Sequence, residues 1–317
     1  MPFDAKSTTD DVLAGINLEG KTVVITGASG GLGAECARSM ASVGASVILA
    51  SRDFPKTQEK AKEIIELTGN PEVSAVALDL ADQDSVRKAA SEILEKVSSI
   101  DILINNAGIM ACPPATTAQG LESQFGINHI GHFLFTSALM PALLKPEKSR
   151  LVILSSGAHK MSNLHIDDLN WQQHEYQNWM VYAASKTANS LFAVEFNKRY
   201  ADQGITANAV HPGLIITDLG RHLSPEDAAA ILGGFSDDMD PSDYIKTIPS
   251  GAATSVWAAT SPDLEGNGGN YLEDCGFASP ASPDEPLNGY EAYALDPDTA
   301  SALWLKSEEI IGEKFAS

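Results

Sequence analysis

The chain has 317 residues, 44% of them apolar, which is enough to build a full hydrophobic core. Its 21 Lys and Arg against 42 Asp and Glu give a formal net charge of −21, which repels nucleic-acid phosphates and anionic membrane surfaces. We therefore expect a globular protein that binds neither nucleic acid nor membranes.

The cysteines and the N-terminal residues indicate in which cellular compartment the protein is found. Cys36, Cys112 and Cys275 lie far apart and form no CxxC pair, which argues against a disulfide framework and against a zinc site. The first residues lack the basic start and apolar core of a signal peptide, and no apolar run approaches about 18 residues. The sequence predicts a soluble, cytoplasmic protein with no metal site.

Short β-branched runs alternate with segments of helical spacing from residue 21 to about 210, as in repeated βα units around a parallel sheet. The runs are almost continuously apolar, which indicates that helices bury both faces of the sheet. We predict an α/β fold with a doubly wound parallel sheet in a single domain, 1–317. The predicted strands are 22–26, 46–50, 73–77, 100–105, 151–155, 206–210 and 269–272, with late helices around 252–260 and 300–311.

Two long segments interrupt this alternation. Residues 157–178 contain three histidines and Trp171 and are typical of a long connection between a strand and a helix. Residues 214–250 mix apolar side chains with acidic and Pro-containing turns. Connections of this length are usually functional or disordered. We predict a substrate-covering lid at 214–250, with a surface excursion as the alternative.

The first predicted strand runs directly into a glycine-rich turn, GASGGLG at 27–33, followed by a helical segment. Glycines at a strand-to-helix turn let the backbone approach a pyrophosphate, which the helix N-terminus then holds. The turn therefore predicts a dinucleotide-binding, or Rossmann, fold. The spacing Gly27-x3-Gly31-x-Gly33 differs from G-x-G-x-x-G, so a simple glycine-rich turn stays an alternative.

The same turn also satisfies G-x-S-x-G, the elbow that presents a nucleophilic serine, here Ser29, in α/β hydrolases. That elbow needs earlier strands, one of which supplies the oxyanion hole. Only about 20 residues precede this first strand, which is too few for those earlier strands. The position of the pattern therefore argues against a hydrolase.

The second predicted strand ends in Ser51-Arg52-Asp53, where dinucleotide folds contact the adenosine ribose. A hydroxyl and a guanidinium suit a 2′-phosphate, because Arg binds phosphate bidentately. We predict NADP here. The alternative is a solvated Arg52 paired with Asp53.

Tyr182 is followed four residues later by Lys186, at the start of a helical pattern. This spacing puts both side chains on one helix face. A phenol with a pKa of about 10 needs a nearby cation to do acid–base chemistry near neutrality, and Lys186 can supply it. A chance surface pair is the alternative.

Six features in register over about 190 residues resemble the short-chain dehydrogenase/reductase family. They are TGASGGLG at 26–33, Asn105-Asn106-Ala107-Gly108, Asn128, Ser155-Ser156, Tyr182-x3-Lys186 and His211-Pro212-Gly213. SSGAH at 155–159, GNYLEDC at 269–275 and ALWLKSEEIIG near the end are similar to the branch that contains retinol dehydrogenases and WW-domain oxidoreductases. The resemblance covers nearly the whole chain.

The resemblance implies catalytic roles for four residues. Tyr182 would be the general acid/base, and Lys186 would lower its pKa and hold the nicotinamide ribose. Ser156 would polarise the substrate carbonyl, with Ser155 as its competitor because adjacent strand residues face opposite ways. Asn128 would anchor a water-mediated proton relay to the lysine.

The resemblance also implies the cofactor contacts, among them an adenine contact from Asp79 and a nicotinamide amide contact from Thr217. The full predicted set is Gly27, Ser29, Gly31, Leu32, Gly33, Ser51, Arg52, Asp79, Leu80, Asn106, Ala107, Gly108, Tyr182, Lys186, Pro212, Gly213, Ile215 and Thr217. Position 30 is glycine, whereas NADP-preferring members often carry a basic residue inside this motif. Arg52 is therefore almost the only residue predicted to bind the 2′-phosphate of NADP, and NAD is the alternative cofactor.

The resemblance implies an enzyme that interconverts an alcohol and a carbonyl with NADP(H). The apolar residues of 214–235, together with Met110, predict a lipophilic or aromatic alcohol, ketone or aldehyde as the small-molecule substrate. Membrane-bound retinol dehydrogenases have an N-terminal apolar anchor that this chain lacks, so a retinoid does not follow. A non-catalytic dinucleotide-binding scaffold or redox sensor is the alternative, and a homo-oligomer stays open.

The remaining histidines and tryptophans are less specific. His129 and His132 are three residues apart without a third ligand nearby, so we interpret them as helix packing residues. His159, like His165 and His174, is expected to decorate the long connection rather than to touch substrate. Trp171 and Trp179 would either line a pocket or fasten that connection to the core.

Overall fold

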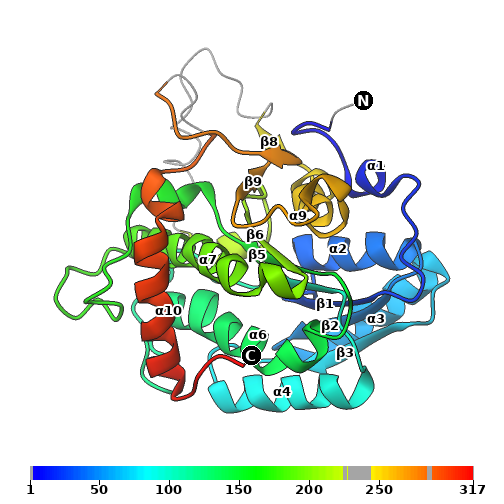
Figure 1. Ribbon diagram of the computed structural model, residues 1–317, viewed down its shortest axis with the longest axis horizontal. Helices are drawn as coiled ribbons and strands as arrows, with labels where there is room; N and C mark the ends of the chain where they lie inside the picture. Colours follow the sequence, from blue (N-terminus) through cyan, green and yellow to red (C-terminus); the bar gives the residue numbers. More distant parts are fainter. Residues whose placement is uncertain (1–2, 224–226, 228–243, 284–287, 317) are drawn as a thin grey trace.

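In the computed structural model, residues 3–223, 227, 244–283 and 288–316 are described. Their central sheet has eight strands in the order β10-β9-β6-β5-β4-β1-β2-β3, parallel throughout except for the antiparallel pair β9–β10 (Figure 1). The strands are β1 Thr22–Thr26, β2 Ser46–Ser51, β3 Val73–Ala77, β4 Ile102–Asn105, β5 Ser149–Leu154, β6 Ile205–Val210, β9 Tyr271–Glu273 and β10 Gly276–Phe277. The predicted doubly wound parallel sheet is confirmed.

Helices cover both faces of this sheet, with α2 and α9 above it and α4 and α6 below it in the view of Figure 1. The α-helices are α1 Thr9–Leu13, α2 Gly31–Ser42, α3 Phe54–Thr68, α4 Gln83–Lys96, α5 Ser123–Phe125, α6 Gly131–Leu143, α7 Asn178–Tyr200, α9 Ile248–Thr260 and α10 Pro297–Ile311. A π-helical turn, η1 Gly126–Ile130, leads into α6. The 3-10 turns are η2 Gly157–Met161, η3 Ala201–Gln203, η4 Asp218–His222, η6 Pro262–Leu264 and η7 Ala292–Leu295.

The strand order reverses between β1 and β4, which are neighbours although two strands separate them in the sequence. In open α/β sheets, ligands bind at such a reversal, outside the carboxyl ends of the strands. A second, two-stranded parallel pair, β7 Leu214–Ile215 with β8 Ile245–Lys246, lies after the sixth strand. The fold therefore brings the glycine turn after β1 beside the Asn106 loop after β4.

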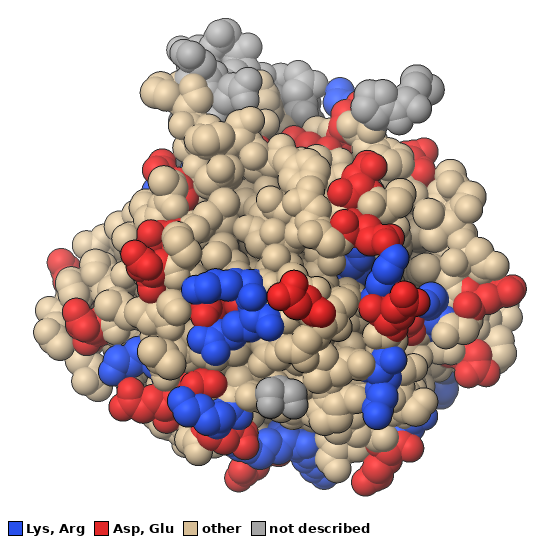
Figure 2. Space-filling view, in the orientation of Figure 1, with Lys and Arg blue, Asp and Glu red and all other residues tan. Residues whose placement is uncertain are grey.

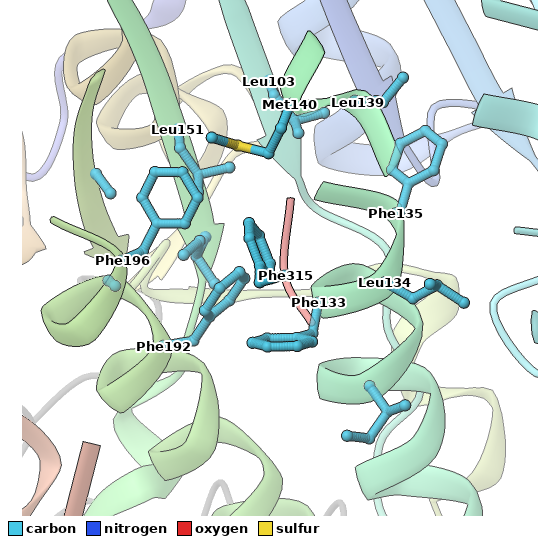
Figure 3. Close-up of a cluster of buried hydrophobic side chains, with 14 of the residues drawn as sticks. Leu103, Phe133, Leu134, Phe135, Leu139, Met140, Leu151, Phe192, Phe196 and Phe315 are labelled. Carbon is cyan, nitrogen blue, oxygen red and sulfur yellow. The ribbon is translucent and has the colours of Figure 1, made fainter. Parts of the chain in front are cut away.

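An aromatic cluster packs α6, α7 and the C-terminal residues together (Figure 3). The ring of Phe133 in α6 lies 5.3 Å from that of Phe192 in α7 and 4.8 Å from that of Phe315, measured between centroids. All three side chains are almost fully buried. Such tilted and T-shaped pairs add about 0.5–1.5 kcal/mol each beyond the burial of their area. The cluster holds fixed the helices that carry the candidate catalytic residues.

The differences from the predicted elements have local causes. Strand ends shift by one or two residues, as at β5, where the Ser149 N–H donates to the Gly204 carbonyl and lengthens the ladder. The hairpin strand β10 was not predicted, because its turn residues Asp274 and Cys275 hold φ of 50° and 56° without the glycine that usually marks such turns. Helix α1 was also not predicted, although the Thr8-x-x-Asp11 capping box marks its start.

The predicted lid at 214–250 lies largely beyond the described part of the chain. Residues 224–226 and 228–243 are outside it. Its described ends, 214–223 and 244–250, include the strand pair β7–β8 and line the cavity treated below. A lid over the substrate stays a prediction.

Candidate active site

A cavity of about 2030 Å³ opens where the carboxyl ends of the parallel strands meet. Residues that follow β1, β2, β3, β4, β5 and β6 all contribute to its wall. A drug-sized ligand needs about 300–1,000 Å³, so this cavity has room for a dinucleotide and a substrate together. Every predicted cofactor and catalytic residue lines it except Gly33 and Asn128, which lie behind its wall.

The glycine turn is shaped by contact with the loop that follows β4. A Cβ on Gly27, whose φ is +68°, would lie 2.8 Å from the Ala107 Cα, and one on Gly33 would lie 2.5 Å from Asn106 Nδ2. A Cβ on Gly30 would meet nothing within 4 Å, because this residue faces the cavity. Gly30 caps α2 without a side-chain hydrogen bond, so the first N–H groups of the helix are left for a ligand.

The end of β2 forms the rim where a 2′-phosphate would lie. Ser51 is buried, and its hydroxyl accepts a hydrogen bond from the Ser29 N–H at 3.2 Å. Arg52 is exposed and lines the cavity. Asp53 caps α3 by accepting the Lys56 N–H at 3.1 Å, and within the described residues no ion pair joins it to Arg52. The alternative of an Arg52–Asp53 pair is therefore not what the structure shows.

The end of β3 supplies the next part of the wall. Asp79 Oδ1 accepts the Ala81 N–H at 3.0 Å, and the Asp79 N–H donates to the Ser85 hydroxyl at 3.0 Å. These bonds hold the turn that places Asp79 and Leu80 against the cavity. The predicted adenine contacts thus lie beside the rim formed by β2.

Tyr182 and Lys186 lie one turn apart on α7 and are buried, with 2% and 4% of their surfaces exposed. Lys186 Nζ lies 5.7 Å from the centroid of the Tyr182 ring and donates a hydrogen bond to the Leu154 carbonyl at 3.0 Å. Burial raises the pKa of Tyr182 to about 12 and lowers the pKa of Lys186 to about 8. Tyr182 is therefore a neutral proton donor in the free protein.

The two serines after β5 point in different directions. The Ser155 hydroxyl donates to the Lys186 carbonyl at 2.9 Å and accepts a bond from the Ser190 hydroxyl, so it fastens α7 to the sheet. A hydrogen bond with the Ser156 side chain lowers the pKa of Tyr182 and opposes part of the effect of burial. Of the two competitors, Ser156 is thus the serine beside the tyrosine.

Asn128 lies in the π-helical turn η1, fully buried behind the cavity. Its Oδ1 accepts the Ile109 N–H at 2.9 Å, and its Nδ2 donates to the Ile109 carbonyl and to the Ser185 hydroxyl. A Cβ on Gly108 would lie 3.2 Å from Asn128 Oδ1 and 3.6 Å from Lys186 Nζ. Asn128 and Lys186 therefore converge on the backbone of Gly108.

The segment after β6 closes the opposite wall. Thr217 caps η4 through the Leu219 N–H and lies 3.8 Å from where a Cβ on Gly31 would be. Ile215 packs against Gly251 of α9. This segment, which begins at Pro212 and Gly213, therefore faces the glycine turn across the cavity.

The histidine and tryptophan interpretations need one correction. His159 is fully buried, and its Nδ1 donates to the Ser156 carbonyl at 2.7 Å while its Nε2 accepts the Glu291 N–H. It therefore supports the serine loop and does not decorate the connection. Trp179 lines the cavity, whereas Trp171 packs against the core.

The described lining of the cavity carries more basic than acidic side chains, unlike the chain as a whole. Figure 2 shows acidic side chains scattered over the face seen there, with Lys and Arg among them. Among the described residues, seven of the 21 Lys and Arg line the cavity, against five Asp and Glu. The seven are Lys6, Arg52, Lys56, Lys160, Lys186, Arg221 and Lys246. Like charges gathered in a cleft attract an anionic ligand, which a dinucleotide is.

Two kinds of feature are absent from the described residues. No helix in this part of the chain is long and apolar enough to cross a membrane. Within the same residues, no cluster of three or more His, Cys, Asp or Glu could hold a metal ion.

Comparisons with known proteins agree with this geometry. The short chain dehydrogenase family profile matches residues 21–228. Retinol dehydrogenase 13 of Homo sapiens is 38% identical over 297 residues, which cover 93% of this chain and 86% of that protein. A short-chain dehydrogenase/reductase of Penicillium roqueforti is 38% identical over 312 residues, covering 96% and 89%.

Solved structures show the same relationship. An uncharacterised protein from Mycobacterium paratuberculosis has a TM-score of 0.74 and 34% identity, and the match covers 98% of this chain and 100% of that one. A short chain dehydrogenase from Escherichia coli CFT073, complexed with NADPH, has a TM-score of 0.62 and 27% identity over 81% and 97% of the two chains. This chain belongs to the short-chain dehydrogenase/reductase family and is an oxidoreductase of its retinol dehydrogenase-like branch.

Proposed function

We propose that the protein uses NADP(H) to interconvert a lipophilic or aromatic alcohol and its ketone or aldehyde. The observation that carries this proposal is the meeting of Tyr182, Lys186 and Ser156 in one cavity with the glycine turn. The glycine turn, the uncapped start of α2 and the seven cations fit a dinucleotide. When bound, the cofactor supplies or accepts the hydride.

The chain's own residues would transfer the proton and bind the oxygen atom of the substrate. In reduction, the Tyr182 hydroxyl gives its proton to the carbonyl oxygen, and the Ser156 hydroxyl donates a hydrogen bond to the same oxygen. The Lys186 cation stabilises the phenolate left behind. Oxidation reverses these steps. Because burial holds the pKa of Tyr182 at about 12, its hydroxyl is protonated in the free protein at neutral pH, which is the state that donates a proton in reduction.

Apolar side chains in the cavity support a lipophilic substrate. Met110, Met161 and Trp179 line it, with the Trp179 ring beside that of Tyr182, and Leu219 and Leu223 line it from the segment after β7. The human relative is named for retinol, a lipophilic alcohol. These observations support the substrate class without selecting a retinoid.

Assays with a panel of carbonyl compounds, each with NADPH and with NADH, test the proposal. We expect turnover with lipophilic or aromatic ketones and aldehydes and the highest kcat/KM with NADPH. A strong preference for sugars or charged acids would contradict the substrate class. Tight NADPH binding without turnover of any compound would favour the non-catalytic scaffold or redox sensor.

The choice of cofactor rests on Arg52, at the rim beside Ser51. Lys56, four residues after Arg52, also lines the cavity, and its Nζ lies 3.7 Å from Asp218 Oδ2. The similar protein from Escherichia coli was solved with NADPH. These observations support NADP, with NAD as the alternative.

We expect Arg52→Ala to raise KM for NADP(H) about ten- to a hundredfold and to leave KM for NAD(H) nearly unchanged. The reason is that only NADP(H) carries the phosphate, and charged hydrogen bonds contribute about 1.5–3 kcal/mol. Steady-state kinetics with both cofactors measure this. Equal effects on the two would show that Arg52 binds something other than the phosphate.

A further inference from the structure

His132 of α6 is buried and lies outside the cavity, yet both of its ring nitrogens are engaged. Nδ1 lies 2.9 Å from the Asn128 carbonyl oxygen, and Nε2 lies 2.8 Å from Thr26 Oγ1. A carbonyl oxygen only accepts, so Nδ1 carries the proton. In the neutral ring Nε2 then accepts, and the Thr26 hydroxyl must donate to it. Burial lowers the pKa of His132 to about 4, which keeps the ring neutral at pH 7.

Thr26, the last residue of β1, connects His132 to the loop after β4, which is predicted to bind the cofactor. Its Oγ1 accepts the N–H groups of Asn106 at 2.9 Å and Ala107 at 3.0 Å. A hydroxyl has one proton and two acceptor sites, so these three bonds use all of them. His132 therefore decides which way the Thr26 hydroxyl points and leaves both of its acceptor sites for the loop after β4.

Asn128 connects His132 to α7, the helix that carries Tyr182 and Lys186. Its Nδ2 donates to the Ser185 hydroxyl at 2.9 Å, and that hydroxyl donates to the Tyr182 carbonyl at 2.7 Å. The π-helical turn that contains Asn128 is a distortion often found at functional sites. Hydrogen bonds thus link Asn106 and Ala107 through Thr26, His132, Asn128 and Ser185 to the Tyr182 carbonyl, with the backbone carbonyl of Asn128 on one side and its side-chain amide on the other.

We propose that His132 is a positioning residue, which couples the dinucleotide-binding loop at Asn106 and Ala107 to the Asn128 and Tyr182 end of the active site. The inference rests on the proposed function, since it assumes that this loop binds the cofactor. Without His132, the Thr26 hydroxyl loses the acceptor that orients it and the Asn128 carbonyl loses a donor. Both ends of the site are then less firmly held.

His129 provides a matched control in the preceding turn. It is as deeply buried, but its Nε2 bonds the Ser307 hydroxyl of α10, and Asn189 of α7 is the other side chain that hydrogen-bonds it. Its ring lies among Phe125, Phe133 and Phe192, in the aromatic cluster. A histidine that acts only by packing should behave like His129.

The test compares His132→Phe with His129→Phe. Both variants should lose thermal stability. We expect only His132→Phe to raise the Kd for NADPH and to lower kcat, each by about ten- to a hundredfold, because small misplacements of a site have effects of that size. It should also speed amide hydrogen exchange at Asn106 and Ala107 in the protein without cofactor. Equal behaviour of the two variants in Kd, kcat and exchange would overturn the inference.

A double-mutant cycle separates coupling from general damage. If His132 acts through Thr26, adding Thr26→Val to His132→Phe should raise the Kd for NADPH no further than the larger single effect. Independent, additive effects would refute the coupling. If His132→Phe does not fold, His132→Asn replaces it in both comparisons, because Asn can still donate to the Asn128 carbonyl four residues earlier but does not reach Thr26. We then expect the Kd to rise and kcat to be largely kept.

Cofactor binding by the wild-type protein distinguishes failure of the proposed function from failure of the role proposed for His132. Failure of the wild type to bind NADPH or NADH would contradict the proposed function itself. Normal binding by the wild type, with His132→Phe matching His129→Phe, would contradict only the role of His132.

Discussion

Replacing Tyr182 by Phe should lower kcat by at least about 100-fold, in line with general acid–base contributions of roughly 10²- to 10⁴-fold. The substitution removes the proposed proton donor and its hydrogen bond with Ser156. It keeps the ring, which is 2% exposed and packs beside Trp179. Cofactor affinity should therefore survive. Steady-state kinetics for kcat and a fluorescence titration with NADPH measure the two quantities.

Tyr176→Phe is the control for this prediction. The Tyr176 hydroxyl lies outside the cavity, where it donates to Glu122 Oε1 at 3.1 Å and accepts a bond from Gln124 Nε2. We expect some loss of stability and a nearly unchanged kcat. If Tyr176 proved essential and Tyr182 dispensable, the roles assigned to Ser156 and Lys186 would have to be abandoned as well.

Lys186→Met should lower kcat by at least about 100-fold without destabilising the protein. The variant lacks the cation that stabilises the phenolate, so acid–base catalysis by Tyr182 fails. The buried charge itself is costly, since burial lowers the pKa of Lys186 from 10.5 to about 8, which corresponds to about 3 kcal/mol. The Leu154 carbonyl loses one donor but still accepts from Asn189 Nδ2 at 2.8 Å. At pH 7 we expect the free energy of unfolding to equal or exceed that of the wild type.

The pH dependence of stability tests whether burial of the charged Lys186 side chain destabilises the folded protein. Below about pH 8 Lys186 is protonated in both the folded and the unfolded state, so the cost of burying the charge is present in full. Between pH 8 and 10.5 the folded protein has lost this proton and the unfolded chain still binds it, so stability rises with pH. Urea unfolding at several pH values should show this rise in the wild type and not in Lys186→Met.

Lys198→Met, on the same helix, is the matched control. Lys198 is exposed and pairs with Glu195 at 3.5 Å, far along α7 from the tyrosine. We expect its kcat and its stability profile between pH 8 and 10.5 to follow the wild type. Loss of more than about 2 kcal/mol of stability in Lys186→Met at pH 7 would contradict the burial argument.

Much of the fold follows from local sequence. Continuous apolar runs such as 47–50 and 151–154 are long enough for one strand and bounded by polar residues, so the strands and their parallel pairing could be predicted. The glycine turn could be recognised because its glycines follow the first strand directly, and the structure shows why they are needed, since a Cβ at Gly27 or Gly33 would collide with the loop after β4. The Tyr182 and Lys186 pair could be predicted because four residues make one helical turn.

Other features depend on residues that only folding brings together. Ser155 and Ser156 are adjacent in the sequence, and packing against α7 decides which of them lies beside Tyr182. Lys6 and Lys246 are about 240 residues apart and line the same cavity. Neither belongs to a local motif, so no pattern marked them.

By itself, the sequence determined the doubly wound sheet, the glycine turn and the helix that carries Tyr182 and Lys186, because each depends on residues a few positions apart. The tertiary structure alone decided the roles of His132 and His159, which look in the sequence like packing or loop histidines. A buried imidazole has two nitrogens to satisfy, and their partners are Thr26, 106 residues away, and the Glu291 N–H, 132 residues away. Such partners are set by the meeting of distant strands and helices, since burial makes each unmade hydrogen bond costly.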